Sequence, residues 1–247
     1  MNITKLFDYS VPLVAASTIL VAGAMAVSLY AGSVAYSIKL AEDTIEVTGS
    51  AREPVVADEA RWVLNLETKT GIVDQQAGFD RLDKGAERIT TYLTEQGFTE
   101  YETPAGNSYP NYTYPQYGEP IMTGYTVSRQ VIVRSSDVEK LSTLANNVQP
   151  LTGEGYNLST CSLELTYSKL AEMRVKLLSQ AIKDAEERAK AIAQDSGRAV
   201  KTLRNASSGV VQVLPEGGIE VSDSGSYDTQ SMHKEVMVTV RATFSIE

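Results

Sequence analysis

The feature that most constrains this chain is an uncharged apolar run near its N-terminus. No charged side chain occurs over the 30 residues from Tyr9 to Ile38, which are rich in Val, Ala, Leu and Ile. A bilayer-spanning helix needs about 20 apolar residues, whereas the apolar part of a secretory signal is about 7–15 long. The length therefore predicts a retained transmembrane anchor at residues 9–38, after a short N-terminus at 1–8.

A cleavable signal peptide is the alternative interpretation of the same run. Ser33, Val34 and Ala35 form a small-x-small cleavage motif, but only Lys5 precedes the run as a basic side chain. With so small an N-terminus, we expect residues 1–8 in the cytoplasm and residues 39–247 on the other side of the membrane. On this topology the bilayer is a partner through residues 9–38.

Composition excludes several classes of function. The 247 residues carry 22 Lys and Arg against 31 Asp and Glu, a formal net charge of −9. Nucleic-acid binding needs clustered basic side chains, so no nucleic-acid partner is expected. A single Cys and a single His exclude a disulfide framework and a Cys/His-rich zinc site.

Hydrophobic periodicity outlines the region after the anchor. Period-two alternation predicts strands, and apolar residues three or four apart predict helices. The expected strands lie around 44–48, 60–68, 125–134, 161–165, 200–203, 210–214 and 236–246, and the expected helices around 79–93, 137–148 and 168–196.

Several boundaries and pairings follow from local residues. Gly49 and Pro54 are expected to end the first strand, which would pair with 60–68 as a hairpin. Ser136 and Glu139 match a capping box at a helix start, and Gly97 suits a helix end. The order of elements predicts an α+β fold, a mostly antiparallel sheet with helices packed on one face, and no domain boundary within 39–247.

Two segments are expected to lack regular structure. Residues 101–125 hold six of the 13 Tyr and four of the eight Pro, which predicts a projecting loop. Residues 215–233 are rich in Gly, Ser and acids and are expected to be mobile. Tyr is enriched at interfaces, so we expect a subunit contact or a ligand platform at Tyr109, Tyr112, Tyr114 and Tyr117.

Three ordered segments resemble the SIMPL domain family of bacterial cell-envelope proteins. Residues 45–51 form a strand with a V-x-G-x-A-like ending, and residues 124–133 resemble the family's Y-x-x-x-x-x-V-x-V strand. That strand is followed by a D-x-x-K-L helix start at Asp137, Lys140 and Leu141. Residues 181–193 resemble the family's helix with Ala at every fourth position, which ends at Gly197. The closing strand at 236–246 also fits.

The resemblance implies a bacterial envelope protein with no established catalytic or ligand-binding residues. Some relatives assemble into ring-like, channel-like homo-oligomers, and others are linked to stress responses. We therefore expect a single-pass inner-membrane protein whose main domain, in the periplasm or outside the cell, forms a ring- or cage-like homo-oligomer. The alternative is a tethered sensor that recognises an envelope ligand through its Tyr/Pro-rich loop.

The side chains that could take part in a reaction do not form a catalytic pattern. His233 lies in a Gly/Ser/acid segment without a nucleophile motif, and its spacing to Asp223 and Asp228 matches no metal site. Cys161 shares the parity of Leu163 and Leu165, which predicts a buried apolar role. We therefore expect no enzyme, no cofactor, no metal and no catalytic residue.

Overall fold

The structure is a computed structural model that describes residues 19–36 and 43–247. Residues 1–8 and the outer parts of the expected anchor, 9–18 and 37–38, lie outside the described residues. The chain folds into two compact units. The first unit comprises the described residues up to Ser50 with 181–208 and 240–247, and the second comprises 51–180 and 209–239.

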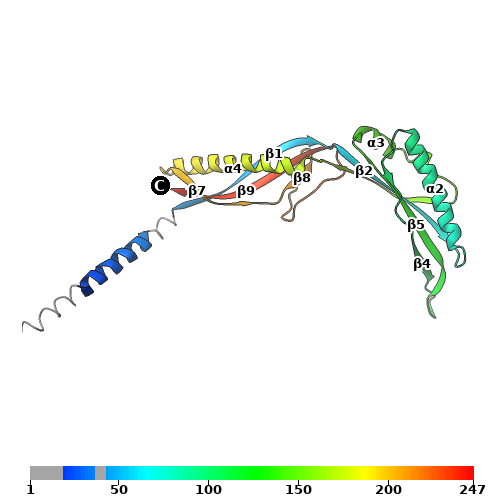
Figure 1. Cartoon of the computed structure of the whole chain (residues 1–247), viewed down its shortest axis with the longest axis horizontal. Coiled ribbons are helices and arrows are strands. Elements are labelled where there is room, and N and C mark those ends of the chain that lie inside the picture. Colours follow the sequence, from blue (N-terminus) through cyan, green and yellow to red (C-terminus); the bar gives the residue numbers. More distant parts are fainter. Residues whose placement is uncertain (1–18, 37–42) are drawn as a thin grey trace, which may run out of the picture. The chain divides into compact units, whose positions relative to one another are not determined.

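The described strands form two sheets (Figure 1). One has the order β1 (Thr44–Val56), β9 (His233–Ile246) and β7 (Val200–Ser208), with β8 (Gln212–Pro215) also paired to β9. The other has the order β3 (Tyr101–Glu102), β5 (Ile121–Ser135), β2 (Glu59–Thr70) and β6 (Asn157–Thr166), with β4 (Asn107–Thr113) paired to β5.

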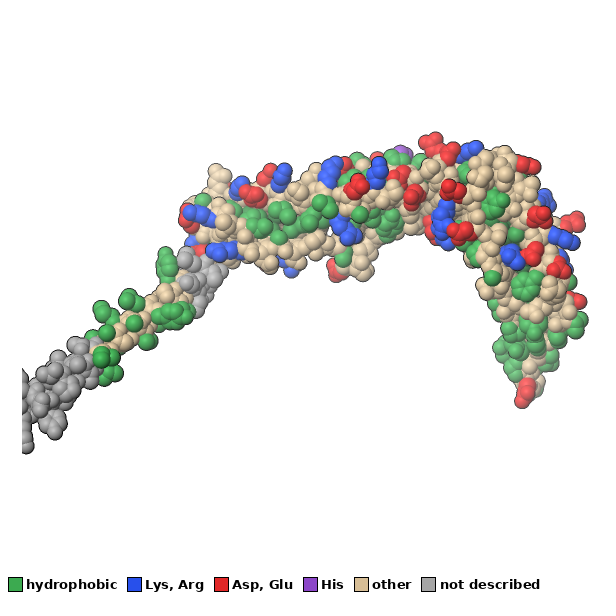
Figure 2. All heavy atoms as spheres, in the orientation of Figure 1, with side chains coloured by type: hydrophobic (Ala, Val, Ile, Leu, Met, Phe, Trp, Pro, Cys, Tyr) green, Lys and Arg blue, Asp and Glu red, His purple; other side chains and the backbone are tan. Residues whose placement is uncertain are grey.

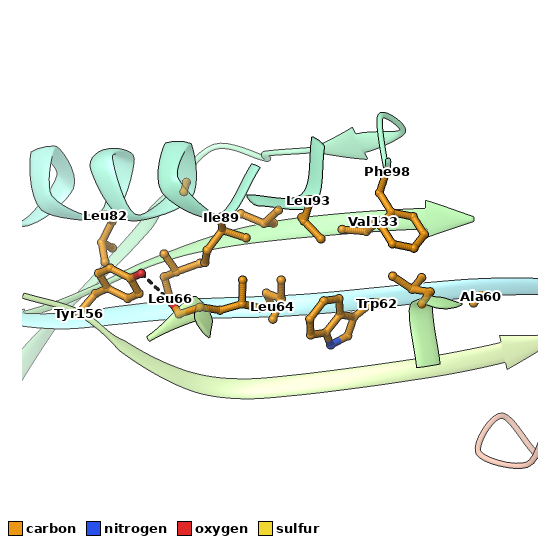
Figure 3. Close-up of a cluster of buried hydrophobic side chains, with 14 of the residues drawn as sticks. Ala60, Trp62, Leu64, Leu66, Leu82, Ile89, Leu93, Phe98, Val133 and Tyr156 are labelled. Atoms are coloured by element: carbon orange, nitrogen blue, oxygen red, sulfur yellow. Dashed lines mark hydrogen bonds between the residues drawn. The ribbon is translucent and has the colours of Figure 1, made fainter. Parts of the chain in front are cut away.

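The core of the second unit lies between α2 (Gln75–Glu95) and the sheet centred on β2. Trp62 is opposite Val133 on β5 and Leu163 on β6, in antiparallel register. Figure 3 shows side chains from α2, among them Ile89, pointing toward those of β2. The buried faces of β2, α2 and β5 agree with the predicted periodicity. The following residues are fully buried: Trp62, Leu64, Leu66, Leu82, Ile89, Leu93, Val127, Val131 and Val133.

A short helix and a 3-10 turn follow β5, and the helix contacts β2 and β6. α3 (Val138–Ala145) buries Val138 and Leu141 and is followed by a 3-10 turn at Gln149–Leu151. The helix start differs from the capping-box prediction. Asp137, and not Ser136, is the N-cap, and its carboxylate accepts a 3.1 Å hydrogen bond from the Lys140 amide. Asp137 takes this role because Asp is as good an N-cap as Ser and stands directly before the first helical residue.

α4 (Leu170–Asp195) lies along β1 (Figure 1), and its part from Ala181 onward belongs to the first unit. Its apolar stripe is confirmed at four small side chains that are each at most 1 % exposed, Ala181, Ala185, Ala189 and Ala193. The spacing also predicts Ile192 in the same stripe, but Ile192 is 54 % exposed. A Cβ atom at Gly49 would lie 2.8 Å from the Cβ of Ala185. Glycine therefore lets the strand approach the helix closely.

Two predictions about β1 are wrong. The strand runs without interruption through Gly49 and Pro54, and it pairs with β9 rather than with β2. Gly49 serves packing against α4 instead of ending the strand. Pro54 is tolerated because β1 stands at the end of its sheet order, where only one side of the strand has a ladder partner.

The segment 101–125 is not an irregular loop. β4 pairs antiparallel with β5 from Asn107 opposite Ser128 to Thr113 opposite Ile121, with a register shift after Asn111. Pro110 is accommodated because β4 is the outer strand of this pair. The strands expected around 200–203 and 210–214 are present as β7 and β8, and each of them pairs antiparallel with β9. The fold is α+β with antiparallel sheets, and the packing of all helices on one face stays a prediction.

Candidate interaction surfaces

The four predicted tyrosines lie together on the β4–β5 hairpin. Every residue from Tyr109 to Ile121 is exposed except Asn111, which is half-buried. Tyr114 and Tyr117 are 75 % and 87 % exposed, and Ile121 is 60 % exposed. The base of the hairpin is held by a 2.9 Å hydrogen bond from the Thr126 hydroxyl to the Asn111 side-chain oxygen. The hairpin therefore presents aromatic side chains to solvent on a paired backbone.

A second exposed apolar turn lies beside the base of this hairpin. β2 ends at Thr70 opposite Tyr125, and the turn that leads to α2 carries Ile72 and Val73. Val73 is 91 % exposed. Gly124 adopts a φ of +150° and lies against Thr70 so closely that a Cβ there would collide with the Thr70 carbonyl oxygen. The two turns consequently belong to the same end of the sheet.

The segment 215–233 is bound to a buried glutamine through its backbone, and the mobility expected for it stays a prediction. Gln212 is 6 % exposed. Its side-chain nitrogen donates a 2.6 Å hydrogen bond to the Ser222 carbonyl, and its oxygen accepts a 2.7 Å bond from the Ser226 amide. The Gln212 side chain thus supplies hydrogen-bond partners to a backbone carbonyl and a backbone amide of the loop, which a neighbouring strand would supply in a sheet. The loop presents two exposed aliphatic side chains, Ile219 and Val221.

A buried ion pair fixes the end of the same loop. Lys234 is fully buried, and its ammonium donates bonds of 2.6 Å to the Asp228 carbonyl and 3.1 Å to the Asp228 carboxylate. Burial acts to raise the pKa of Asp228, but hydrogen bonds from the Gln230 amide, Ser231 and Lys234 outweigh it and hold that pKa below its usual range. Asp228 therefore stays ionised opposite the lysine.

Comparison with known proteins places this fold in a family. The SIMPL family model, described as a protein of unknown function (DUF541), matches residues 45–244. The chain belongs to the SIMPL family. It is 24 % identical over 234 residues to the uncharacterized protein YggE of Edwardsiella ictaluri, an alignment that covers 88 % of this chain and 95 % of the relative.

This SIMPL chain also carries an N-terminal helix that is apolar enough to cross a membrane. The helix spans Ile19–Tyr36 in the described part of the chain and makes no buried contact. A signal sequence near the N-terminus meets the same criterion of length and hydropathy, so the helix alone does not distinguish an anchor from a signal. The serine hydroxyls in it are satisfied internally, since Ser28 donates to the Ala24 carbonyl at 2.8 Å.

The other predicted reactive residues of this SIMPL chain are scattered. His233 is exposed at the start of β9, and Asp228 is engaged by Lys234. Over residues 19–36 and 43–247, no group of three or more His, Cys, Asp or Glu side chains is arranged to hold a metal. The burial predicted for Cys161 is wrong, since it is exposed. It lies opposite Leu64, but on the outer strand β6, whereas α2 covers β2 and β5.

Sequence reasoning missed the Lys234–Asp228 pair and the Ile72–Val73 turn. One signal for the lysine was present: Lys234 has the same parity as the buried residues Val236 and Val238 of the closing strand. The turn carried no periodic signal, because two adjacent aliphatic residues between a strand and a helix are common in cores as well as on surfaces.

Proposed function

We propose that this protein is a membrane-anchored subunit of a homo-oligomer in the bacterial cell envelope. The apolar N-terminal helix would hold each copy in the inner membrane, with the SIMPL region in the periplasm or outside the cell. Copies would associate laterally into a ring or cage with a structural role. Family membership supports the envelope assignment, and the surface of the second unit supports association.

The observation that carries this proposal is the anchored loop 215–233. Ile219 is 83 % exposed and Val221 is 58 % exposed. Contiguous exposed apolar side chains mark interaction sites, and Ile219 and Val221 stand two residues apart on the same loop. Because Gln212 and Lys234 already order the loop, a partner would bind it with a smaller loss of conformational entropy.

Membrane tethering strengthens such a contact. Anchored copies are confined to one surface, which raises their effective concentration and favours contacts that would be weak in solution. A chain anchored by one helix can therefore assemble through loops of modest area.

We also propose that the role is not catalytic. The carboxylates whose pKa values are displaced serve structural partners, as Asp228 does for Lys234 and the Gln230 amide. Displaced pKa values mark active sites only when the group faces a site where substrate can bind. Asp228 instead faces the loop that it holds.

The test is the mass of the full chain in mild detergent, measured by light scattering. We expect one defined oligomer. The double variant Ile219→Lys and Val221→Lys should dissociate it, because each contact would then bury two cations that have no partner. The double variant Val175→Lys and Ile192→Lys is the matched control, since Val175 and Ile192 are 69 % and 54 % exposed on α4 and the charge change is the same.

A monomeric full chain at high concentration would overturn the proposal. An oligomer that survives the double variant would remove the loop from the contact. A chain that begins at Lys39 lacks the N-terminal helix. A large mass for this chain would show that residues 39–247 assemble without the helix.

A further inference from the structure

The end of the second unit that carries the β4–β5 hairpin is apolar over two neighbouring turns. We define the hairpin tip as residues 109–121 together with Ile72 and Val73. Figure 2 shows hydrophobic side chains gathered over the end of this hairpin, with an acidic side chain at its extremity. The exposed members are Ile72, Val73, Tyr109, Tyr112, Tyr114, Tyr117 and Ile121.

The hairpin segment of the tip is almost free of charge, whereas Lys69 and Asp74 flank Ile72 and Val73 in the neighbouring turn. Between Glu102 and Arg129 the chain has one charged residue, Glu119, although 21 % of the whole chain is charged. No basic side chain occurs in this segment, and the chain as a whole carries a net charge of −9. Attraction to anionic groups therefore cannot bring a partner to the tip, and apolar and aromatic contacts must do so.

Exposure on both faces distinguishes this hairpin from an ordinary sheet edge. A two-stranded ribbon is marginally stable in water unless another layer covers one face. Here the strands extend past the end of α2's sheet contacts, and nearly every side chain from Tyr109 to Ile121 is exposed. The proline residues 110, 115 and 120 restrict the backbone, so the ribbon is stiffer than its length alone suggests.

We propose that the hairpin tip inserts into the interfacial layer of a phospholipid bilayer. Tyrosine is enriched at membrane–water interfaces, where its ring lies among the headgroups and its hydroxyl stays hydrated. Because Ile72 and Val73 flank the base of the hairpin, the ribbon would lie along the membrane surface, so that these residues and Ile121 face the upper acyl chains while Glu119 in the turn stays hydrated. This inference rests on the membrane anchoring proposed above, which keeps the chain at a lipid surface.

A lipid surface fits the tip better than a second copy of the chain does. The tip is a convex projection, which would need a complementary uncharged recess on the partner. Three cavities of the second unit are each lined by ionised side chains, for example Asp83 and Glu87 in one and Arg61 and Glu164 in another. Several of these charges are ion-paired, Arg61 with Glu164 at 3.0 Å and Arg129 with Asp83 at 2.6 Å, and an aromatic hairpin in such a recess would remove the pairs from water, which costs free energy.

The experiment places an environment-sensitive label on the tip of the full chain. In a Cys161→Ser background, Tyr117→Cys is labelled with a nitrobenzoxadiazole dye, and the protein is incorporated as one copy per phosphatidylcholine nanodisc. Glu154→Cys is the control, because Glu154 is exposed in a turn of the same unit outside the tip. Lipids with a bromine-substituted chain are the quencher, either in the disc or in added protein-free vesicles.

We expect bromolipid in one of the two membranes to lower the emission at position 117 roughly twofold, since a tip at this depth lies within reach of the upper acyl chain. Emission at position 154 should not change. Adding Val73→Asn and Ile121→Asn should abolish the quenching while the unfolding temperature of the labelled protein stays close to that of the parent.

The proposal would be overturned if position 117 were quenched neither by bromolipid in the disc nor by bromolipid in added vesicles. A spectral shift that appears only when several copies share a disc, without quenching by lipid, would assign the tip to a second copy and would also overturn it. Failure of anchoring is recognised separately, because the chain would then not be recovered with the disc at all.

Discussion

The backbone amide of Ser50 donates a 2.7 Å hydrogen bond to the carboxylate of Asp184, which connects β1 to α4 across 134 residues of sequence. The bond lies next to the close approach of Gly49 to Ala185. Hydrogen bonding from Ser50, aided by Arg188, lowers the pKa of Asp184 against the opposing effect of burial. This contact makes the first unit sensitive to acid.

Asp184→Asn tests that sensitivity. A carboxylate with a lowered pKa in the folded state stabilises the protein above its ordinary pKa of about 3.9, and the stabilisation is lost as the pH falls further. The free energy of unfolding by urea should therefore be lower in the variant at pH 7, and the difference should shrink below pH of about 4. Glu187→Gln, an exposed carboxylate of the same helix, should show no comparable trend. A deficit that is the same at all pH values would contradict the assigned cause.

Gly49→Ala should destabilise the first unit. The added methyl would press on α4, and overpacking of this kind costs about 1–3 kcal/mol. Chemical denaturation measures the loss directly. Thr48→Ala, at the neighbouring exposed position of β1, is the control and should cost clearly less. Equal losses in the two variants would mean that strand propensity, and not helix contact, decides the effect.

Lys234→Met should destabilise the second unit by about 3 kcal/mol, because removal of one member of a buried pair leaves the other charge unpaired. The double variant Lys234→Met and Asp228→Asn should recover part of that loss. The measurement is a double-mutant cycle: the free energy of unfolding by denaturant is compared among the wild type, Lys234→Met, Asp228→Asn and the double variant. A double variant no more stable than Lys234→Met would contradict a coupled pair.

The N-terminal helix should be retained in the mature protein. Intact mass of the protein purified from membranes should begin at Met1, and the protein should resist alkaline carbonate extraction. A mass that begins at Tyr36 would instead identify residues 1–35 as a cleaved signal peptide. Removal of residues 1–38 should release the remainder from the membrane, because it removes the only described helix able to span a bilayer.

Periodicity predicted the parts of the fold in which one face is covered along its whole length. The spacing of Leu82, Ile89 and Leu93 located the buried face of α2, and the alternation from Val236 to Phe244 located that of β9. The ordered motifs also identified the family, and the tyrosines were recognised as exposed interface candidates. Their exposure is now described, whereas their partner is still a proposal.

Periodicity failed where the position of an element in its sheet decides the outcome. Pro54 and Pro110 suggested breaks, yet both lie in strands because outer strands tolerate a missing donor. Cys161 has core parity but lies beyond the cover of α2. No local pattern reports whether a strand is central or outer.

By itself, the sequence determined the anchor-like N-terminal run, the α+β class, the buried faces of the long helices and strands, and the family. Each of these depends on residues close together in the chain, so local spacing and length are sufficient to reveal them. Only the tertiary structure decided that β1 pairs with β9, that Gly49 is a contact with α4, and that Gln212 and Lys234 hold the loop 215–233. These features join residues far apart in sequence, and their free energy arises only when the chain has folded and water has been excluded from between them.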